Sequence, residues 1–505
     1  MNRLTLFGLL LSWGSLAAQT TNPANRAVAG ITAEAVARHI GVIADDSMMG
    51  RDTPSRGLEL TAEYVAAEFA RAGLLPGGEG GTWFQRYPIT HRRLDLARSQ
   101  VGFRAGAVVA TAALDRDARY LQGVGPQQPV RGPVLLVGGS LTPGDLTRVR
   151  LRDRVVLFVP GGDRSLPTRD ARVGRALRLA GPKAVIMVSS LDSAGFADRL
   201  PRRVPPRTAV DLGAPNPPFV EVNRSVVAAA LLAAGVDPTS VGASPTPVMR
   251  EVPGLTIEVA LADSVLLATS APNTIGILEG SDPRLKHEFL IYSAHMDHIG
   301  ISPGQRDSIN NGADDDASGT AGVIELAKAF AQPGARPKRS IVFLTVSGEE
   351  KGLWGSRYFS EHPTVPLDRV VADFNIDMIG RNWRDTIVAI GKEHSDLGAT
   401  LQRVNRAHPE LGITAIDDRW PEERFYFRSD HYNFARKGVP VLFFFNGVHP
   451  DYHRPTDSAE KIDSEKEGRI LRLLFFLGRE VANAPRRPRW NPESYRAIVE
   501  APDAP

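Results

Sequence analysis

The hydrophobic pattern of the C-terminal half alternates between short apolar runs and longer stretches of helical periodicity. The apolar runs, which predict strands, lie at 288–294, 340–346, 370–376 and 439–445. The stretches with helical periodicity lie at 318–330, 353–360, 397–408 and 464–482. Strands that alternate with helices build a sheet covered on both faces, so we expect an α/β domain with a mostly parallel sheet flanked by helices.

The N-terminal part contains two predicted helices, after which the pattern of residues changes. Residues 32–43 and 57–73 show helical periodicity, and Gly73 can close the second helix. Between residues 100 and 252, short β-rich runs are separated by Pro, Gly and Asp. These runs lie at 101–109, 133–137, 154–159 and 184–189, with one helix predicted at 170–179. The pattern predicts a smaller β-rich domain inserted into the first one.

The first 20 residues have the layout of an export signal. Arg3 precedes an apolar stretch at 4–13, and small residues at 15–18 suit cleavage. We interpret 1–18 as a signal peptide; the alternative is a buried N-terminal helix. The apolar stretch is too short to span a bilayer, so we expect an exported protein, periplasmic or extracellular, without stable membrane insertion.

Length and composition narrow the classes of function. A chain of 505 residues predicts more than one domain. We expect a first segment at 19–99, the inserted domain at 100–252, a catalytic segment at 253–485 and an irregular tail at 486–505. The chain has no Cys, which excludes disulfides, thiolate zinc sites and a Cys nucleophile. A net charge of +3 argues against a nucleic-acid partner.

Potential metal ligands follow every predicted strand of the C-terminal half. They are His295, Asp297 and His298, then Glu349 and Glu350, then Asp377, and finally His449, Asp451 and His453. Alone, each has a structural explanation: for example, Asp314–Asp316 could cap the following helix. Together they lie where ligands bind in open parallel sheets, at the carboxyl ends of the strands. Imidazole and carboxylate ligands without sulfur suit zinc, manganese or cobalt, and the imidazoles favour zinc.

Five motifs in this order resemble the co-catalytic di-zinc aminopeptidases, whose relatives include glutamate carboxypeptidase, glutaminyl cyclase and the transferrin receptor. The motifs are Ala-His-Met-Asp-His at 294–298, Asn-Gly-Ala-Asp-Asp-Asp-Ala-Ser-Gly at 311–319, Ser-Gly-Glu-Glu at 347–350, Asn-Ile-Asp-Met-Ile-Gly at 375–380 and Tyr-His-Arg-Pro-Thr-Asp at 452–457. The resemblance covers roughly 49–73 and 273–470 and implies a zinc-peptidase/phosphorylase-like architecture. Residues 100–252 resemble, more weakly, the protease-associated domain that some members carry.

The resemblance implies two Zn²⁺ per chain and a ligand for each motif. His295 and Asp377 would hold one ion, Glu350 and His453 the other, and Asp315 would bridge them. The family often has Asn beside the bridging position, where this chain has Asp314 and Asp316. All three aspartates are therefore candidates for the bridge, and the alignment favours Asp315.

The resemblance also implies roles for residues beside the ligands. Asp297 would accept a hydrogen bond from His295 and fix its tautomer, and Glu349 would be the general base for a metal-bridging water. Tyr452 would help to stabilise the oxyanion. Arg428 would shape the substrate site; its alternative is a structural ion pair with Asp430.

The expected function is an exported zinc-dependent aminopeptidase that acts on peptide substrates. A carboxypeptidase or a glutaminyl-cyclase-like acyltransferase on the same scaffold is the alternative, and a non-catalytic receptor-like binding module is a third possibility. Carboxypeptidase action needs a basic pocket, for which Arg381, Arg384, Arg424 and Arg428 are candidates. The motifs of single-zinc metalloproteases, serine hydrolases and P-loop proteins are absent from the sequence. No oligomeric state is indicated.

Overall fold

The computed structural model describes residues 22–123, 128–161, 173–174, 176–177, 180–200, 207–210, 217–304 and 306–500. These residues form two compact units: one runs to Tyr87 and resumes from Ser270 to Glu500, and the other runs from Pro88 to Thr269. The segment expected at 100–252 lies within the second unit. The proposed signal peptide at 1–18 lies outside the described residues, as does most of the helix predicted at 170–179.

The first unit contains a mixed, largely parallel sheet with the strand order β17-β16-β18-β15-β13-β14-β12. The strands are β12 (Leu255–Leu278), β13 (Phe289–His295), β14 (Ser340–Val346), β15 (Val370–Ile376), β16 (Thr386–Ile390), β17 (Thr414–Ile416) and β18 (Val441–Phe444). β13 pairs in parallel with both β14 and β15, and β15 pairs in parallel with β18. β12 pairs antiparallel with β14, and β16 antiparallel with β18. The predicted α/β class is confirmed.

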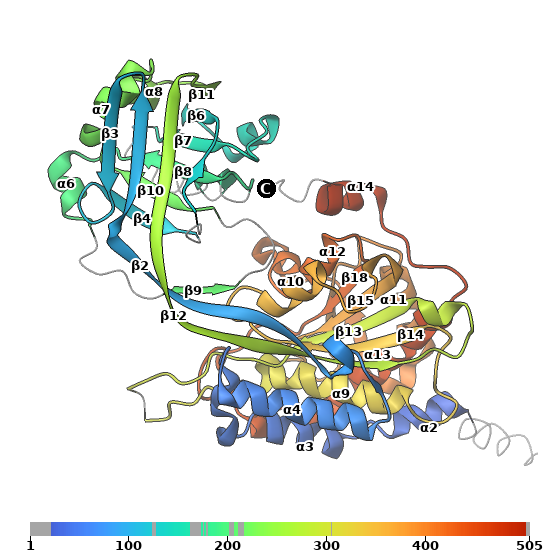
Figure 1. Cartoon of the computed structure of the whole chain (residues 1–505). Helices are drawn as coiled ribbons and strands as arrows, with labels where there is room; N and C mark the ends of the chain where they lie inside the picture. The colour runs from blue at the N-terminus through green and yellow to red at the C-terminus, as the bar shows by residue number, and fades with distance from the viewer. Residues whose placement is uncertain are drawn as a thin grey trace, which may run out of the picture. The chain divides into compact units, whose positions relative to one another are not determined.

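Helices cover both faces of this sheet (Figure 1). They are α2 (Pro23–Ala29), α3 (Ala33–Ile43), α4 (Arg56–Arg71), α9 (Gly319–Phe330), α10 (Trp354–Glu361), α11 (Leu397–Ala407), α12 (His431–Ala435) and α13 (Ser464–Asn483). α3, α4 and α9 lie below the sheet in Figure 1, and α10 and α12 lie above it.

Two apolar cores explain why the central strands read as unbroken apolar runs. Leu290 and Tyr292 of β13 point into a core shared with α3, α9 and α13, whereas Ile291 points into a core shared with α10 and α12. Successive side chains of a strand point to opposite faces, so a strand covered on both faces is apolar at every position. All seven residues of β14 are buried, as are all seven of β15.

The helices begin where the sequence supplies a cap. Thr32 accepts a hydrogen bond from the Ala35 amide at the start of α3, and Ser55 accepts one from Leu58 at the start of α4.

The prediction of an irregular tail was wrong in part. Pro492–Tyr495 form α14, and a π-helical segment follows at Arg496–Glu500. Asn491 caps α14, and a proline is well tolerated in the first turn of a helix, so Pro492 starts the helix rather than preventing it.

The second unit contains a separate sheet with the order β11-β6-β7-β8-β10-β4. Its strands are β4 (Ala118–Gln122), β6 (Val134–Gly139), β7 (Val155–Val159), β8 (Ala184–Val188), β10 (Phe219–Val222) and β11 (Pro247–Glu251). β6, β7, β8 and β10 are parallel, and the two edge strands are antiparallel. The helices of this unit are α6 (Ser193–Ala197), α7 (Arg224–Ala233) and α8 (Pro238–Gly242). The unit is a small mixed α/β structure, and its likeness to a protease-associated domain stays a prediction.

Two long strands, β2 (Phe84–Ala105) and β12, each cross the boundary between the units. The run predicted as one strand at 101–109 is divided, because Gly106 turns the chain with a φ of 57° between β2 and β3 (Val108–Ala113). The short strands β1 (Leu75–Pro76) and β5 (Val130–Arg131) pair with β12, and β9 (Arg207–Val210) pairs with β2.

Within the described residues, no helix combines the length and hydropathy needed to cross a bilayer.

Candidate metal centre

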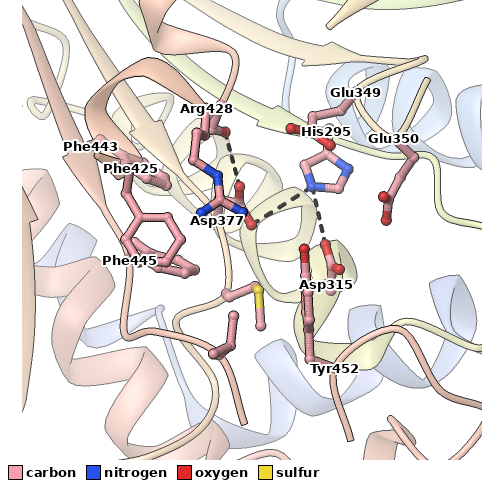
Figure 2. A pocket seen from close by; sticks show the side chains of 13 residues that line it. His295, Asp315, Glu349, Glu350, Asp377, Phe425, Arg428, Phe443, Phe445 and Tyr452 are labelled. Carbon is pink, nitrogen blue, oxygen red and sulfur yellow. Dashed lines mark hydrogen bonds and ion pairs between the residues drawn. The ribbon is translucent and has the colours of Figure 1, made fainter. Parts of the chain in front are cut away.

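The carboxyl ends of the parallel strands bring the candidate ligands to one edge of the sheet. His295 is the last residue of β13, and Asp377 directly follows β15. Glu349 and Glu350 follow β14, and His453 lies in the loop after β18. A cavity at this edge is lined by His295, Asp315, Glu349, Glu350 and Asp377, among others (Figure 2).

One potential metal group consists of His295, Asp315 and Asp377, all buried. The His295 Nε2 atom lies 3.3 Å from Asp315 Oδ1 and 3.7 Å from Asp377 Oδ1. Figure 2 shows the imidazole between the two carboxylates. Burial lowers the pKa of His295, but contacts with Asp297, Asp315 and Asp377 outweigh burial and raise that pKa well above its usual value.

A second potential group consists of His298, Asp315 and Glu350. His298 Nδ1 lies 2.8 Å from Glu350 Oε1 and 3.7 Å from Asp315 Oδ2. His453 Nε2 reaches the same two carboxylates, at 3.2 Å from Asp315 Oδ2 and 3.1 Å from Glu350 Oε2. Asp315 thus directs Oδ1 at the first group and Oδ2 at the second, as a bridging carboxylate must.

The chemistry of these atoms fits a bound cation. Asp315 Oδ2, Glu350 Oε1, Asp377 Oδ1 and both ring nitrogens of His298 are buried and have no hydrogen-bond partner among the described residues. These atoms lie close together without hydrogen bonds of good geometry, and because buried polar atoms in native proteins are normally paired, such a convergent group indicates a ligand. Imidazole nitrogens and carboxylate oxygens are suitable ligands for zinc.

His298 is one of the potential ligands predicted from the sequence, but the family resemblance assigns it to neither ion. Its side chain is fully buried, and it lies three positions after His295 in the same loop. The available signal was that the first motif holds a second histidine directly after Asp297. Gly312 makes room for this ring, because a Cβ atom at position 312 would lie 2.6 Å from the His298 side chain.

The three consecutive aspartates are separated by their partners. Asp316 Oδ2 accepts a hydrogen bond from the His295 amide at 3.1 Å, and its Oδ1 accepts from the Gly319 amide at 2.8 Å. Asp314 Oδ1 accepts from the Gly380 amide at 2.6 Å, and Asp314 Oδ2 faces His449 Nε2 at 3.3 Å. The carboxylate of Asp315 is therefore the one of the three that faces both metal groups.

Asp297 makes contacts that differ from the expected ones. Its carboxylate is 3.7 Å from His295 Nδ1, which instead contacts the Asp297 main-chain oxygen at 3.2 Å. Asp297 Oδ1 accepts a hydrogen bond from the Glu349 amide at 3.2 Å, and Oδ2 accepts one from Thr53 at 3.1 Å. The Asp297 carboxylate therefore positions the backbone of Glu349. One hydroxyl donor and one amide donor occupy its oxygens, so the histidine ring contacts the main chain instead.

Glu349 lies at the cavity wall with a strongly perturbed carboxyl group. Burial raises the pKa of Glu349 well above its usual value; His295 opposes this shift, and the like charges of Asp430 and Asp377 add to it. Tyr452 also lines the cavity, and its ring stacks on His453 with centroids 3.9 Å apart. Burial, followed by the charge of Asp315, raises the pKa of the Tyr452 phenol, so it stays a hydrogen-bond donor.

Opposite the carboxylates, the cavity has an apolar wall (Figure 2). Its apolar members are Met378, Phe425, Phe443, Phe445 and Val448. Arg428 also lines the cavity; its guanidinium lies 4.7 Å from the centre of the Phe425 ring and 3.4 Å from Glu423 Oε2. The alternative ion pair with Asp430 is not formed, since neither Asp430 carboxylate oxygen has a hydrogen-bond partner among the residues that the structure describes.

The other candidate arginines are not part of this lining. Arg381 pairs with Asp451 at 3.0 Å, and Arg384 pairs with Asp463 at 3.2 Å. The guanidinium of Arg424 lies over the Phe427 ring. Of the four arginines considered for binding a C-terminal carboxylate, Arg428 alone lines the cavity.

Comparison with known proteins agrees with this geometry. Residues 273–477 match the family model described as Peptidase family M28. Aminopeptidase YwaD of Bacillus subtilis (strain 168) is 28% identical over 237 residues, which cover 44% of this chain and 47% of that protein. A probable zinc metalloprotease of Pyricularia oryzae is 27% identical over 268 residues, covering 45% of this chain and 52% of that protein. The chain thus spans about half the length of these relatives.

Among solved structures, the aminopeptidase from Aneurinibacillus sp. strain AM-1 aligns with 92% of this chain and 97% of its own, at 20% identity and a TM-score of 0.48. The family match spans β13, β14, β15 and β18 and hence every residue of the two metal groups. Over residues 273–477 the chain is therefore similar to peptidase family M28.

Proposed function

We propose that this protein is a zinc-dependent aminopeptidase that hydrolyses the N-terminal peptide bond of peptide substrates. One observation carries the proposal: two buried ligand groups share Asp315 beside a cavity wall that also holds Glu349. The names of the relatives, an aminopeptidase and a probable zinc metalloprotease, support it.

The proposed cofactor is a pair of Zn²⁺ ions. His295 and Asp377 would hold one ion, Glu350 and His453 the other, and the two oxygens of Asp315 would face one ion each. When bound, such a pair supplies a Lewis acid for the scissile carbonyl and lowers the pKa of water between the ions to about 7. His298, which belongs to the second ligand group, contacts Glu350 and Asp315 and would support these two carboxylates.

Protein side chains then handle the protons. The Glu349 carboxylate accepts a proton from the attacking water and returns it to the leaving amine. Its place is fixed by the hydrogen bond from the Glu349 amide to Asp297. The Tyr452 hydroxyl, which faces the same cavity, donates a hydrogen bond to the oxygen that becomes negative in the tetrahedral intermediate.

The cavity favours an apolar side chain in the substrate. Phe425, Phe443 and Phe445 would pack against the N-terminal side chain, and such contacts are worth about 1.5–3 kcal/mol for a large apolar group. A C-terminal carboxylate would need an unpaired cation. Arg428, the arginine of the lining, already pairs with Glu423. This pairing favours aminopeptidase over carboxypeptidase polarity.

We also propose that the protein is exported, on the strength of the charged, apolar and small-residue segments at 1–18. Expression with the full leader and N-terminal sequencing of the protein outside the cytoplasm tests this. Export predicts a mature chain that begins shortly after residue 18. A protein retained in the cytoplasm with its leader intact contradicts it.

A panel of aminoacyl anilides and matched N-acetylated peptides tests the activity. We expect zinc-loaded protein to release the anilide from free-amine substrates, fastest for Leu, Met and Phe, and to spare the acetylated ones. A chelator should abolish turnover, and added zinc should restore it. Hydrolysis of blocked peptides from the C-terminus would favour the carboxypeptidase alternative. Cyclisation of N-terminal Gln peptides with one zinc per chain would favour the acyltransferase.

A further inference from the structure

A carboxylic acid lies in the middle of the sheet behind the metal centre. Asp373 belongs to β15, whose seven residues are all buried, and its own side chain has no exposure to solvent. The Oδ2 atom of Asp373 has no hydrogen-bond partner among the described residues. The charged group that acts on the pKa of Asp373 is a second carboxylate, Asp430, rather than a cation. An ionised carboxylate in this position would be strongly unfavourable.

A chain of hydrogen bonds leads from Asp373 to the candidate metal ligand Asp377. Ser293 Oγ lies 2.8 Å from Asp373 Oδ1 and 2.8 Å from Asn375 Oδ1. Asn375 Nδ2 donates to Ser429 Oγ at 3.3 Å, and Ser429 Oγ donates to Asp377 Oδ2 at 3.0 Å. The geometry follows from the sheet: residues 373, 375 and 377 share one face of β15, and Ser293 is the partner of Asn375 on β13.

Counting hydrogens along this chain favours a protonated Asp373. Ser429 gives its hydrogen to Asp377, so Ser429 must accept from the amide nitrogen of Asn375, and the Asn375 oxygen then faces Ser293. That oxygen can only accept, and Ser293 has a single hydroxyl hydrogen for two oxygens that both lie 2.8 Å away. Both contacts of Ser293 can be hydrogen bonds at the same time only if Asp373 is protonated: Ser293 then donates to Asn375 and accepts from Asp373.

We propose that Asp373 is a positioning residue: a neutral carboxylic acid that donates into the chain Ser293–Asn375–Ser429 and so orients the Asp377 carboxylate toward the metal. The inference rests on the proposed function, because it takes Asp377 as a metal ligand. Every donor in the chain points toward Asp377, and hydrogen bonds that point the same way polarise one another.

As a consequence, the two carboxylate oxygens of Asp377 have different partners. Oδ2 accepts the hydrogen bond from Ser429, while Oδ1 has no hydrogen-bond partner in the described part of the chain and faces His295 Nε2 at 3.7 Å. The chain thus leaves Oδ1 for the metal. Burial, together with the charge of Asp430, raises the pKa of Asp373 to about 8 against the opposing effect of Ser293, so the acid form predominates at pH 7.

An ionised Asp373 would reverse the direction of the hydrogen bonds between Asp373 and Ser429. Ser293 would give its hydrogen to Asp373, the Asn375 amide would turn its nitrogen toward Ser293, and Ser429 would donate to the Asn375 oxygen. Asp377 Oδ2 would then lose its donor. The two protonation states of Asp373 therefore make opposite predictions for the groups around the metal, and an experiment can separate them.

Infrared difference spectroscopy of the zinc-loaded protein at pH 7 tests the protonation directly. The spectrum of the parent minus that of Asp373→Asn should contain the carbonyl stretch of a protonated carboxylic acid, which shifts in D₂O. Ser360→Ala is the matched control: Ser360 is buried and bonds to the Arg357 main-chain oxygen, away from the chain, so its difference spectrum should lack this band. A carboxylate band lost in Asp373→Asn in place of the acid band overturns the proposal.

Zinc affinity, measured by competition with a chromophoric chelator, tests the link to Asp377. We expect Ser429→Ala and Asp373→Leu each to weaken one zinc site about tenfold or more, the usual effect of removing a partner of a metal ligand. Asp373→Asn, whose amide can donate to Ser293, should stay within about threefold of the parent. The double variant Asp373→Leu/Ser429→Ala should be no weaker than Ser429→Ala alone, because one break already disconnects the chain.

The outcomes separate this inference from the proposed function. Additive losses in the double variant, or parental affinity in Ser429→Ala, overturn the chain and leave the metal centre intact. A parent that binds no zinc overturns the proposed function, while the infrared band still reports on Asp373 by itself. If Asp373→Leu fails to fold, Ser293→Ala breaks the same link with a smaller change, and the same tenfold loss is expected.

Discussion

The substitution Arg51→Met should destabilise the first unit and the metal centre together. The Arg51 side chain is fully buried, and its guanidinium donates only to main-chain oxygens. Nε donates to the Met296 oxygen at 2.9 Å, and Nη2 donates to the Gly312 oxygen at 2.9 Å. Nη1 donates to the oxygens of Ile43 at 2.9 Å and Asn311 at 2.5 Å. Three of these carbonyls lie in the two loops that carry His295 and Asp315.

The size of the effect follows from what Met leaves behind. Hydrogen bonds to a charged group contribute ~1.5–3 kcal/mol each, so four of them set an upper limit near 6–12 kcal/mol. Loops relax and water enters, so the measured loss of a buried charged partner is typically ~3–5 kcal/mol. Burial lowers the pKa of Arg51 to about 10 although Asp297, Asp315 and Asp457 oppose the shift, so the group is still a cation at pH 7. We expect Arg51→Met to lose about 3–5 kcal/mol of unfolding free energy.

Urea unfolding of the metal-free protein, followed by tryptophan fluorescence, measures this loss. Every tryptophan in the described part of the chain lies in the first unit, so the signal reports on that unit. With a slope of ~3 kcal/mol per molar urea, the midpoint should fall by about 1 M or more. Arg56→Met is the control: its side chain is 62% exposed and pairs with Glu63 at 3.6 Å, so its effect should stay within about 0.5 kcal/mol. Equal midpoints for Arg51→Met and the parent would refute the reasoning.

Three further substitutions probe other parts of the first unit. Glu349→Gln should keep zinc but lose turnover by about 10²–10⁴-fold, the usual contribution of a general base, measured as kcat alongside metal content; near-parental kcat would exclude Glu349 from this role. His298→Ala should weaken one zinc site about 10–100-fold in chelator competition, and unchanged affinity would show that His298 only fills space. Burial raises the pKa of Glu288, but hydrogen bonds from Arg339 and Arg487 outweigh burial and leave that pKa below its usual value. Glu288→Gln should therefore cost stability at pH 7, and the difference from the parent should disappear as the pH falls through the folded-state pKa; a difference that persists in acid would contradict this ion pair.

The sheet of the first unit could be predicted because its signal is local. The run predicted at 340–346 is β14, and that at 370–376 is β15, because strands covered on both faces carry apolar side chains at nearly every position. The rule that ligands gather at the carboxyl ends of parallel strands then placed His295 and Asp377 together. These predictions needed only the order of residues along single strands and the parallel pairing of neighbours.

What the sequence did not indicate depends on partners far apart along the chain. Asp297 was expected to hold His295, but its oxygens are occupied by Thr53 and the Glu349 amide, which lie 244 and 52 positions away. Arg51 lies 245 positions from Met296, whose carbonyl it binds. No periodicity or short motif encodes such contacts, because they arise only once three separate segments pack around the same strand end. The charged residue in an apolar run is the single local sign, and it applies to Asp373 as it does to Asp377.

The distribution of charge around the strand ends explains why these remote contacts matter. Burial raises the pKa of Asp316, Glu349 and Asp377 above their usual values, which means that folding alone disfavours their ionised forms. Two cations held by the ligand groups would reverse that preference, so metal binding and the ionisation of the centre are coupled. Two groups reduce the unfavourable free energy of these buried charges without a metal. Arg51 places a fixed positive charge beside Asp315, and Asp373 adds a buried acid that donates as a neutral group. The centre is therefore built so that its negative charges are concentrated where the metal binds and avoided one layer behind it.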